Sequence, residues 1–364
     1  MFRCPVNDSL PKLAVFAVIL GGVFAVAALF QINDSKTRNE QKNGLIHNHN
    51  NTALDQPALN RLIDFSDQLS AANALIIEQS GQILLERYSG KDPDYLWSIK
   101  SLSKSVYTSL LIKALEENIV SLEDIACEKN SITIRQLATM TGGVRKRGDT
   151  PCESQMLFQS GEDFAYSDAS VNILLAKIQD GYQHESLANL LRRKVFEPSG
   201  IEGWKWHKNE ERIGSGFRMT AQSILQYGRL WLNKGMVEGK RVLPSELLEK
   251  AIVPANPRLK PDYGFLWWVN GAPSQENYDR YGFTLRPMFS PDIPKDAFLG
   301  AGCTGAYLLV IPSLDLIAVR AGQDCKSIKN NRDALFSLNA RRFVDLVVAA
   351  VSVVDSEKAS FHGG

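Results

Sequence analysis

The chain has 364 residues, of which 44% are hydrophobic and 22% charged, and its formal net charge is +1. This is an ordinary globular composition, long enough for one large domain or two small ones. The near-neutral charge, without a basic stripe interleaved with aromatic residues, gives no electrostatic reason to expect nucleic-acid binding.

The N-terminal segment is first basic and then strongly apolar. Arg3 and Lys12 precede residues 13–30, a run without a polar side chain. As a helix this run would be roughly 27 Å long, just enough to cross a bilayer. A cleaved signal peptide has a similar layout, and residues 25–27 (Ala-Val-Ala) could serve as its cleavage site. We favour an uncleaved anchor over a signal segment for residues 1–30, and both interpretations place the rest of the chain outside the cytoplasm.

Residues 31–57 are polar and rich in Asn, Asp and Lys, which predicts a linker. His47 and His49 in this linker allow a metal site, but solvated linker histidines are the simpler interpretation. We expect the folded domain to span residues 58–354 and to be followed by a tail at residues 355–364.

The five cysteines divide at the apolar segment. Cys4 precedes it, whereas the exported part holds an even set, Cys127, Cys152, Cys303 and Cys325, as suits disulfides in an oxidising compartment. Two β-rich runs around a turn at residues 312–315 bring Cys303 nearly opposite Cys325. A disulfide there and free buried thiols are equally open, and a Cys127–Cys152 disulfide is a weaker prediction of the same kind.

Strands are expected at both ends of the folded domain. Residues 74–88 give two β-rich runs around Ser80-Gly81, which predicts a tight hairpin. Residues 101–250 are mostly helical in pattern. Strands return only at residues 263–269 and in the hairpin around Pro312.

The last elements complete the pattern. An amphipathic helix is expected at residues 333–354. Trp267 and Trp268 are consecutive in a predicted strand, so they point to opposite faces and at most one can line a cleft.

Strands at both ends with helices between them predict an α+β fold. The economical arrangement is one antiparallel sheet built from both ends of the domain, flanked by the terminal helices, with a mainly helical lobe inserted in the middle. A cleft between the lobe and the sheet would be the natural place for a functional site.

Residues 98–120 carry the first chemical signal. Ser101 stands at the head of a helical segment, and Lys104 follows one turn later, so the lysine amine can reach the serine hydroxyl. A helix N-terminus and burial would together favour a neutral lysine that accepts a proton. The simpler interpretation is a helix-capping serine with a solvent-exposed lysine, and this motif alone favours the simpler one.

Other serine nucleophile arrangements are excluded by the sequence. No G-x-S-x-G occurs in the chain, which argues against a nucleophile elbow. None of the five histidines lies in a Gly-rich or strand-end context that suggests a triad base. A serine nucleophile would therefore need another base, and a lysine fits.

Tyr166-Ser167-Asp168 follows at the start of a second helical run. With Ser101 and Lys104 it resembles the Ser-x-x-Lys and Tyr-x-Asn elements of the serine β-lactamase and penicillin-binding-protein superfamily, in the branch related to class C β-lactamases. The resemblance extends over most of residues 64–348, where several segments occur in that branch's order. They are residues 97–111, 114–125, 132–143, 214–244, 263–269 and 300–322. The 6-aminohexanoate-dimer hydrolase-like and esterase members are the most similar in pattern.

The resemblance implies a β-lactamase/transpeptidase-like fold and an acyl-enzyme mechanism without a metal or organic cofactor. Ser101 would be the nucleophile, and Lys104 with Tyr166 the base. The backbone N–H groups of Ser101 and Cys303 would form the oxyanion hole. Asp168, Gly302, Thr304 and Gly305 would line the substrate site.

Two departures from the family pattern bear on the substrate. Position 168 is Asp where the family often has Asn, so an added negative charge would hold Lys104 more cationic unless Asp168 is paired elsewhere. The third family element, Lys-Thr-Gly, is best matched by residues 303–305 or the adjoining 300–302, which lack a cation. This counts against substrates whose carboxylate that lysine would hold. Arg218 or Arg286 could substitute, although each is more simply a surface or structural ion-pair residue.

The sequence thus predicts a serine hydrolase for an ester or linear amide, exported from a bacterial cell and facing the periplasm from the inner membrane, or secreted there if the leader is cleaved. Its partners would be a small-molecule or peptide-like substrate and, through residues 1–30, the membrane. The alternatives are a DD-peptidase or penicillin-binding protein acting on cell-wall peptides, and a catalytically silent binding relative.

Overall fold

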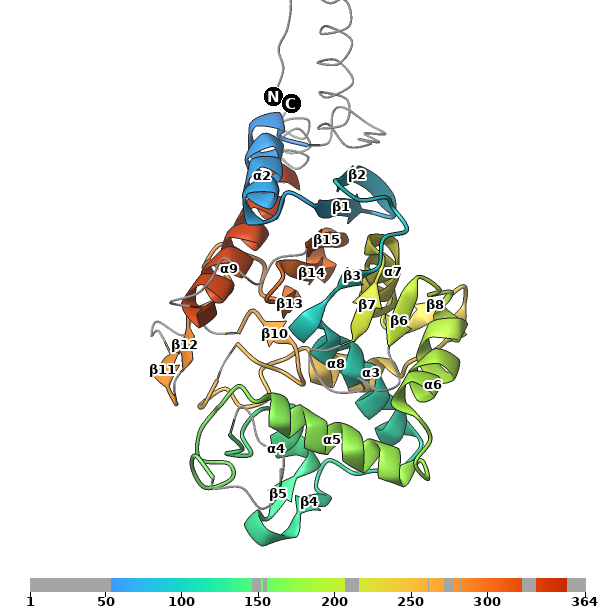
Figure 1. Cartoon of the computed structure of the whole chain (residues 1–364), viewed down its shortest axis with the longest axis vertical. Coiled ribbons are helices and arrows are strands. Elements are labelled where there is room, and N and C mark those ends of the chain that lie inside the picture. Colours follow the sequence, from blue (N-terminus) through green and yellow to red (C-terminus); the bar gives the residue numbers. More distant parts are fainter. Residues whose placement is uncertain are drawn as a thin grey trace, which may run out of the picture. The chain divides into compact units, whose positions relative to one another are not determined.

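The computed structural model describes residues 54–145, 152, 156–206, 216–260, 262–271, 278–281, 283–322 and 332–351 (Figure 1). The predicted anchor, nearly all of the predicted linker and the predicted tail lie outside these ranges, as do His47 and His49. Among the helices within the ranges, none is both long and apolar enough to cross a bilayer.

A six-stranded antiparallel sheet, with the order β10-β13-β14-β15-β1-β2, forms the centre of the domain. Its strands are β1 (Asn73–Gln79), β2 (Gln82–Ser89), β10 (Trp268–Val269), β13 (Phe298–Gly302), β14 (Ala306–Ile311) and β15 (Leu316–Gly322). β1 from the start of the domain pairs with β15 from its end, so the predicted sheet built from both ends is confirmed.

Both predicted hairpins are present. The β1–β2 turn has positive φ angles at Ser80 (50°) and Gly81 (72°), as a two-residue turn between twisted strands requires. β14 and β15 are joined by a 3₁₀ turn, η6 (Pro312–Leu314), and by Asp315 at a φ of 46°. The predicted strand at residues 263–269 is shorter than expected, because only Trp268–Val269 pairs within the sheet.

Helices cover both faces of the sheet (Figure 1). α2 (Gln56–Leu69) and α9 (Arg332–Val351) pack against each other on one side, and α7 (Ala221–Leu232) packs against β14, β15 and β1 on the other. Consequently, every residue of β14 and β15 is buried. The start of α2 is fixed by the Asp55 carboxylate, which accepts a hydrogen bond from the backbone N–H of Ala58 at 2.6 Å.

The middle of the chain forms the predicted helical lobe. Its helices are α3 (Ser103–Glu116), α4 (Ile134–Ala138), α5 (Asp168–Gly181), α6 (Leu187–Leu191) and α8 (Ser245–Ala251), with the shorter turns η1 (Lys100–Leu102), η2 (Glu128–Asn130), η3 (Arg192–Phe196) and η4 (Glu197–Ser199). These elements confirm an α+β fold.

Short strands within the lobe were not predicted. They are β3 (Trp97–Ser98), β4 (Ile125–Cys127), β5 (Ile132–Thr133), β6 (Trp204–Trp206), β7 (Phe217–Met219), β8 (Met236–Val237) and β9 (Lys240–Arg241), and a further hairpin lies nearer the C-terminus, β11 (Tyr278–Arg280) with β12 (Phe283–Leu285). Strands of two or three residues are too short to show an alternating pattern in a sequence.

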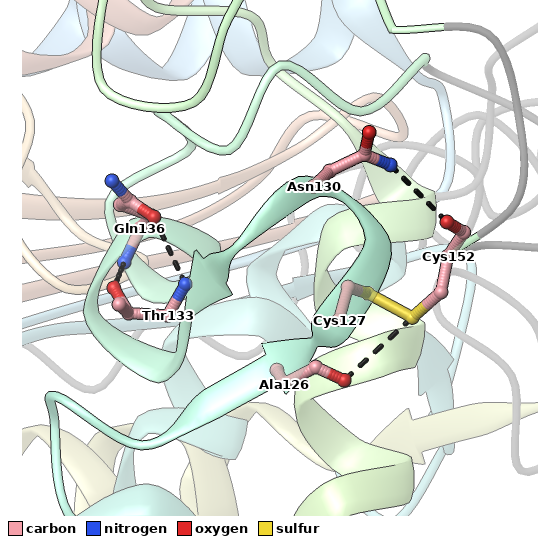
Figure 2. The surroundings of a disulfide bond; sticks show 6 residues. All are labelled: Ala126, Cys127, Asn130, Thr133, Gln136 and Cys152. Atoms are coloured by element: carbon pink, nitrogen blue, oxygen red, sulfur yellow. Dashed lines mark hydrogen bonds between the residues drawn. A yellow bond between two sulfur atoms is a disulfide. The ribbon is translucent and has the colours of Figure 1, made fainter.

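A disulfide joins Cys127, at the end of β4, to Cys152 (Figure 2). The side-chain amide of Asn130 donates a hydrogen bond to the backbone carbonyl of Cys152 at 3.2 Å, beside the bridge. The Cys127–Cys152 pairing predicted from the sequence is therefore confirmed. Cys303 is disulfide-bonded as well, and its expected partner, Cys325, lies outside the described residues.

Removing the Cys127–Cys152 bridge is expected to destabilise the domain. A crosslink between residues 25 apart lowers the entropy of the unfolded chain, which typically contributes about 3 kcal/mol. The Cys127→Ser/Cys152→Ser variant should lower the free energy of unfolding by about that amount, measured by urea denaturation without reductant. The single variant Ser131→Ala, in the same loop, serves as the control, and an unchanged urea midpoint in the double variant would contradict the prediction.

Candidate active site

α3 runs through the interior of the domain and carries several small polar residues. Ser105 and Thr108 donate from their hydroxyls to the carbonyls of Leu266 (3.1 Å) and Phe265 (2.9 Å). The hydroxyl of Ser109 lies 2.7 Å from that of Tyr227. These hydrogen bonds satisfy buried polar groups and fix α3 against the chain segment that leads to β10.

Ser101 and Lys104 meet at the start of α3. Lys104 Nζ donates a hydrogen bond to Ser101 Oγ at 3.1 Å, and the lysine side chain is only 1% exposed. No side-chain cap is present at the N-terminus of η1 or of α3. The alternative interpretation, a capping serine with a solvent-exposed lysine, therefore does not describe this site.

The residue before Ser101 has an unusual backbone conformation. Lys100 has a φ of 47°, in the left-handed region that a residue with a Cβ seldom occupies. Such strain of about 1–3 kcal/mol persists only where surrounding contacts enforce it, and it is often found at functional sites.

Two groups from the helical lobe surround the Lys104 ammonium. Asp168 Oδ1 lies 2.6 Å from Nζ, and the centre of the Tyr166 ring lies 4.8 Å from it. Burial lowers the pKa of Lys104, but the charges of Tyr166 and Asp168 and the hydrogen bonds with both residues outweigh burial, so the pKa is raised above its ordinary value. Asp168 is thus paired with Lys104, and the lysine is cationic near neutral pH.

The start of α5 positions these two groups. Ser167 caps the helix by accepting a hydrogen bond from the N–H of Ser170 at 3.1 Å, and its hydroxyl donates to the carbonyl of Arg145 at 2.9 Å. Asp168 is the first residue of α5, where the helix dipole favours a carboxylate.

An aromatic wall, which we define as Tyr166, Tyr263 and Trp268, lies beside the ion pair. The rings of Tyr166 and Trp268 are stacked with centroids 5.8 Å apart, and the Tyr263 ring meets Trp268 edge-on at 4.8 Å. Burial, together with the charges of Tyr166 and Asp168, raises the pKa of Tyr263 well above its ordinary value, so Tyr263 stays a neutral phenol. Trp267 points the other way, into the core against Trp231, as strand alternation predicts.

Strand β13 closes the other side of the site. A Cβ on Gly302 would lie 2.2 Å from the carbonyl oxygen of Ile99, and one on Gly300 would lie 2.2 Å from Leu102 Cδ1. At Gly302 the clash would be with backbone, so only glycine there lets β13 approach the turn that carries Ser101 so closely. At Gly300 the atom met is a side-chain methyl of Leu102. Thr304 follows β13, and its hydroxyl donates to the carbonyl of Ser98 at 3.0 Å.

The other positions that the sequence assigned to the site, or offered as a substitute cation, lie in several elements. Cys303 is exposed at the end of β13 and Gly305 begins the return into β14. Arg218 lies on β7 directly opposite Ser98, and its Nη1 donates to the carbonyl of Leu96 at 3.4 Å. The backbone N–H of Arg286 donates to Ser337 of α9. Within the described residues, no group of three or more His, Cys, Asp or Glu side chains could hold a metal ion.

A family model, Beta-lactamase, matches residues 64–334. The chain belongs to the Beta-lactamase family. An uncharacterized protein of Alkalihalophilus pseudofirmus is 25% identical over 294 residues, which cover 69% of this chain and 83% of that protein. The family places the protein in the β-lactamase-fold hydrolase superfamily, as the resemblance of its motifs implied.

Solved structures of the same fold match most of the chain. A candidate β-lactamase of Bacteroides dorei has a TM-score of 0.66 at 15% identity, covering 82% of this chain and 99% of its own. A candidate 6-aminohexanoate-dimer hydrolase of Bacillus anthracis has a TM-score of 0.61 at 21% identity, with 80% of this chain and 81% of its own covered. At these identities the likeness shows the fold.

Part of the site was missed from the sequence. Tyr263 and Trp268 were not assigned to it, although strand alternation limited the choice to Trp267 or Trp268. A buried ion pair between Lys260 and Asp262, with an N–O distance of 2.5 Å, lies behind the aromatic wall, with Lys260 Nζ 6.0 Å from the centre of the Trp268 ring. No spacing motif signals such a pair.

Gly302→Ala is expected to destabilise this β-lactamase-family protein, because the added Cβ would meet backbone at 2.2 Å and force β13 away from the Ser101 turn. A loss of about 1–3 kcal/mol in the free energy of unfolding should be measured by urea denaturation. Gly142→Ala is the matched control, since its new Cβ would meet a movable methyl group of Ile132 at 3.0 Å. Equal losses in the two variants would contradict this account of the close approach.

Proposed function

We propose that the protein is a serine hydrolase that cleaves an ester or a linear amide through an acyl-enzyme on Ser101. The observation that supports this most directly is the fully buried Lys104, whose Nζ lies 3.1 Å from Ser101 Oγ and 2.6 Å from Asp168 Oδ1. A buried ammonium is costly, and its placement against a serine hydroxyl has a clear chemical use.

In the proposed first step, Ser101 Oγ attacks the substrate carbonyl and loses its proton. The Lys104–Tyr166 pair must carry one proton fewer than in its resting form to accept it. Lys104 takes the serine proton and passes one on to the Tyr166 oxygen, with which it is hydrogen-bonded. The pair then protonates the leaving group, so it acts as base and acid in turn.

The oxyanion that forms in this step would be held by the backbone N–H groups of Ser101 and Cys303. Support for this assignment comes from the contact between the end of β13 and the Ser101 turn, where a Cβ on Gly302 would lie 3.4 Å from the backbone nitrogen of Leu102. Water would release the acyl group, with Tyr166 as the base.

The substrate class follows from what surrounds Ser101. Position 303 holds an exposed, disulfide-bonded cysteine where the family pattern has a lysine, so no cation stands there to hold a substrate carboxylate. Of the aromatic wall, Tyr166 is only half-buried, and its ring, stacked on the buried Trp268, suits an apolar acyl or leaving group. We therefore place an ester or a linear amide ahead of a cell-wall peptide.

The same proposal includes export to the periplasmic side of a bacterial inner membrane, with residues 1–30 as anchor or signal segment. The disulfide at Cys127–Cys152 and the disulfide-bonded Cys303 support it, because such bonds persist in oxidising compartments.

Hydrolysis of p-nitrophenyl acetate and butyrate by the wild-type protein tests the proposed nucleophile and base. Ser101→Ala should lower kcat/KM by at least about a thousandfold, and Lys104→Met should lower it comparably, because the two residues act as one unit. Ser103→Ala is the matched control, since its buried hydroxyl has no hydrogen-bond partner among the described residues and should leave activity within about threefold.

A fluorophosphonate probe should label Ser101 in the wild type but not in Ser101→Ala. Labelling by fluorescent penicillin, with poor ester turnover, would favour the DD-peptidase or penicillin-binding alternative. A folded protein that neither labels nor hydrolyses esters would favour the silent binding relative.

Asp168→Asn is expected to shift the ascending limb of the pH profile of kcat/KM to lower pH. Removing the carboxylate charge lowers the pKa of Lys104, so the proton-accepting form of the pair appears at lower pH. The shift should be smaller than loss of a fully buried carboxylate would give, because Asp168 is 34% exposed and solvent screens part of its charge. Asp180→Asn, on the exposed end of α5, is the control. A limb that moves to higher pH in Asp168→Asn would show that Asp168 does not act on the pair in this way.

A further inference from the structure

Within the described residues, one arginine of the central sheet has no exposed surface. Arg320 is on β15 and is 0% exposed. Its guanidinium donates three hydrogen bonds: from Nε to Ser66 Oγ at 2.8 Å, from Nη2 to the Ser66 carbonyl at 2.7 Å, and from Nη1 to the Gly305 carbonyl at 2.6 Å. These partners are neutral, so the charge is buried without a directly bonded carboxylate in the described part of the chain.

Such a charge is expensive to bury. Desolvation lowers the pKa of Arg320 to about 10, and the charges of Tyr307 and Asp67 oppose this only in part. A hydrophobic side chain of similar volume would normally be tolerated at a position of this kind, or would even be more stable. The placement of Arg320 therefore needs a reason other than stability.

The guanidinium touches the turn between β13 and β14. We call residues 302–305 the β13–β14 turn. It is closed by a hydrogen bond from the N–H of Gly305 to the carbonyl of Gly302 at 2.9 Å, and Gly305 has a φ of 71°. A Cβ on Gly305 would lie 2.3 Å from Arg320 Nη1, and one on Gly322 would lie 2.7 Å from it. Arg320 is thus enclosed by glycines and holds the turn by its last carbonyl.

The opposite side of the β13–β14 turn is held by the segment before Ser101. Thr304 donates to the carbonyl of Ser98, and Gly302 lies against Ile99. The turn that contains the Cys303 N–H is therefore fixed from two directions: by the nucleophile segment on one side, and by Arg320 and α2 on the other.

We propose that Arg320 is a positioning residue for the oxyanion hole, which fixes the Cys303 N–H by tying the β13–β14 turn to Ser66 of α2. This inference rests on the proposed function for its catalytic consequence. The attachment of the β13–β14 turn to Arg320 is a property of the fold, and hydrogen exchange in that turn measures it without any assay of activity.

The test compares Arg320→Met with the wild type. Hydrogen–deuterium exchange should become faster in the peptide that covers the β13–β14 turn and stay unchanged in peptides of β1 and β2. For p-nitrophenyl butyrate, kcat should fall about 10- to 100-fold with little change in KM, a smaller loss than that of a whole oxyanion donor. Inhibition by phenylboronic acid, whose tetrahedral adduct needs the oxyanion hole, should weaken by a similar factor. The melting temperature should stay within about 3 °C.

Two further variants keep the test decisive if Arg320→Met folds poorly. Ser66→Ala removes the Nε hydrogen bond and keeps the charge, so it should give a milder form of the same pattern. Arg87→Met is the matched control, because Arg87 is another buried arginine of this sheet, 3% exposed, but it pairs with Asp67 at 2.9 Å. It should lower the melting temperature and leave kcat of the folded protein and exchange in the turn unchanged.

The outcomes separate the two proposals. Unchanged exchange in the turn, with unchanged kcat and phenylboronic acid inhibition, would overturn the role of Arg320. Loss of kcat only in proportion to unfolding would also overturn it, since that is what a purely structural residue gives. A wild-type protein inert to esters and fluorophosphonate would overturn the proposed function, while hydrogen exchange in the turn would still decide whether Arg320 holds it.

Discussion

The placement of a lysine ammonium in the interior of the domain is the constraint on which the rest of the site depends. A charge removed from water costs several kcal/mol unless opposite charge and hydrogen bonds surround it. Here the first turn of α3 supplies the lysine, and the start of α5 supplies Asp168, with Tyr166 two residues earlier. The starts of α3 and α5 therefore meet at the ion pair, and the serine hydroxyl lies beside it.

A second requirement is that backbone must approach backbone closely next to Ser101. Gly302 removes the side chain that would otherwise hold β13 away from the backbone of the Ser101 turn. The Lys104–Asp168 ion pair on one side of Ser101 is an electrostatic constraint. The close approach of β13 on the other side is a steric one. Together they leave Ser101 between the Lys104–Asp168 ion pair and the backbone at the end of β13.

Much of this arrangement could be predicted from the sequence because its signals are local. Ser101 and Lys104 are one helical turn apart, and Tyr166 and Asp168 share a short motif at the start of a helix, so their spacing together with the family resemblance reveals them. The hairpins around Ser80 and Pro312 were equally readable from turn residues and β-rich flanks. The stacking of Trp268 on Tyr166 and the contact of Arg320 with Ser66, 254 residues away in the chain, depend on how distant segments meet. For the contact between Arg320 and Ser66, the only signal in the sequence was one arginine within the otherwise apolar residues 316–321.

The enclosure of Arg320 also constrains how this chain can change over evolutionary time. A side chain at Gly305 or Gly322 would occupy the space of the guanidinium, and loss of the guanidinium would free the space at both glycines. The effect of a substitution at any of the three positions therefore depends on the other two. A side chain gained at either glycine before the guanidinium is lost would give a poorly fitting intermediate, so Arg320 should be lost before either glycine changes.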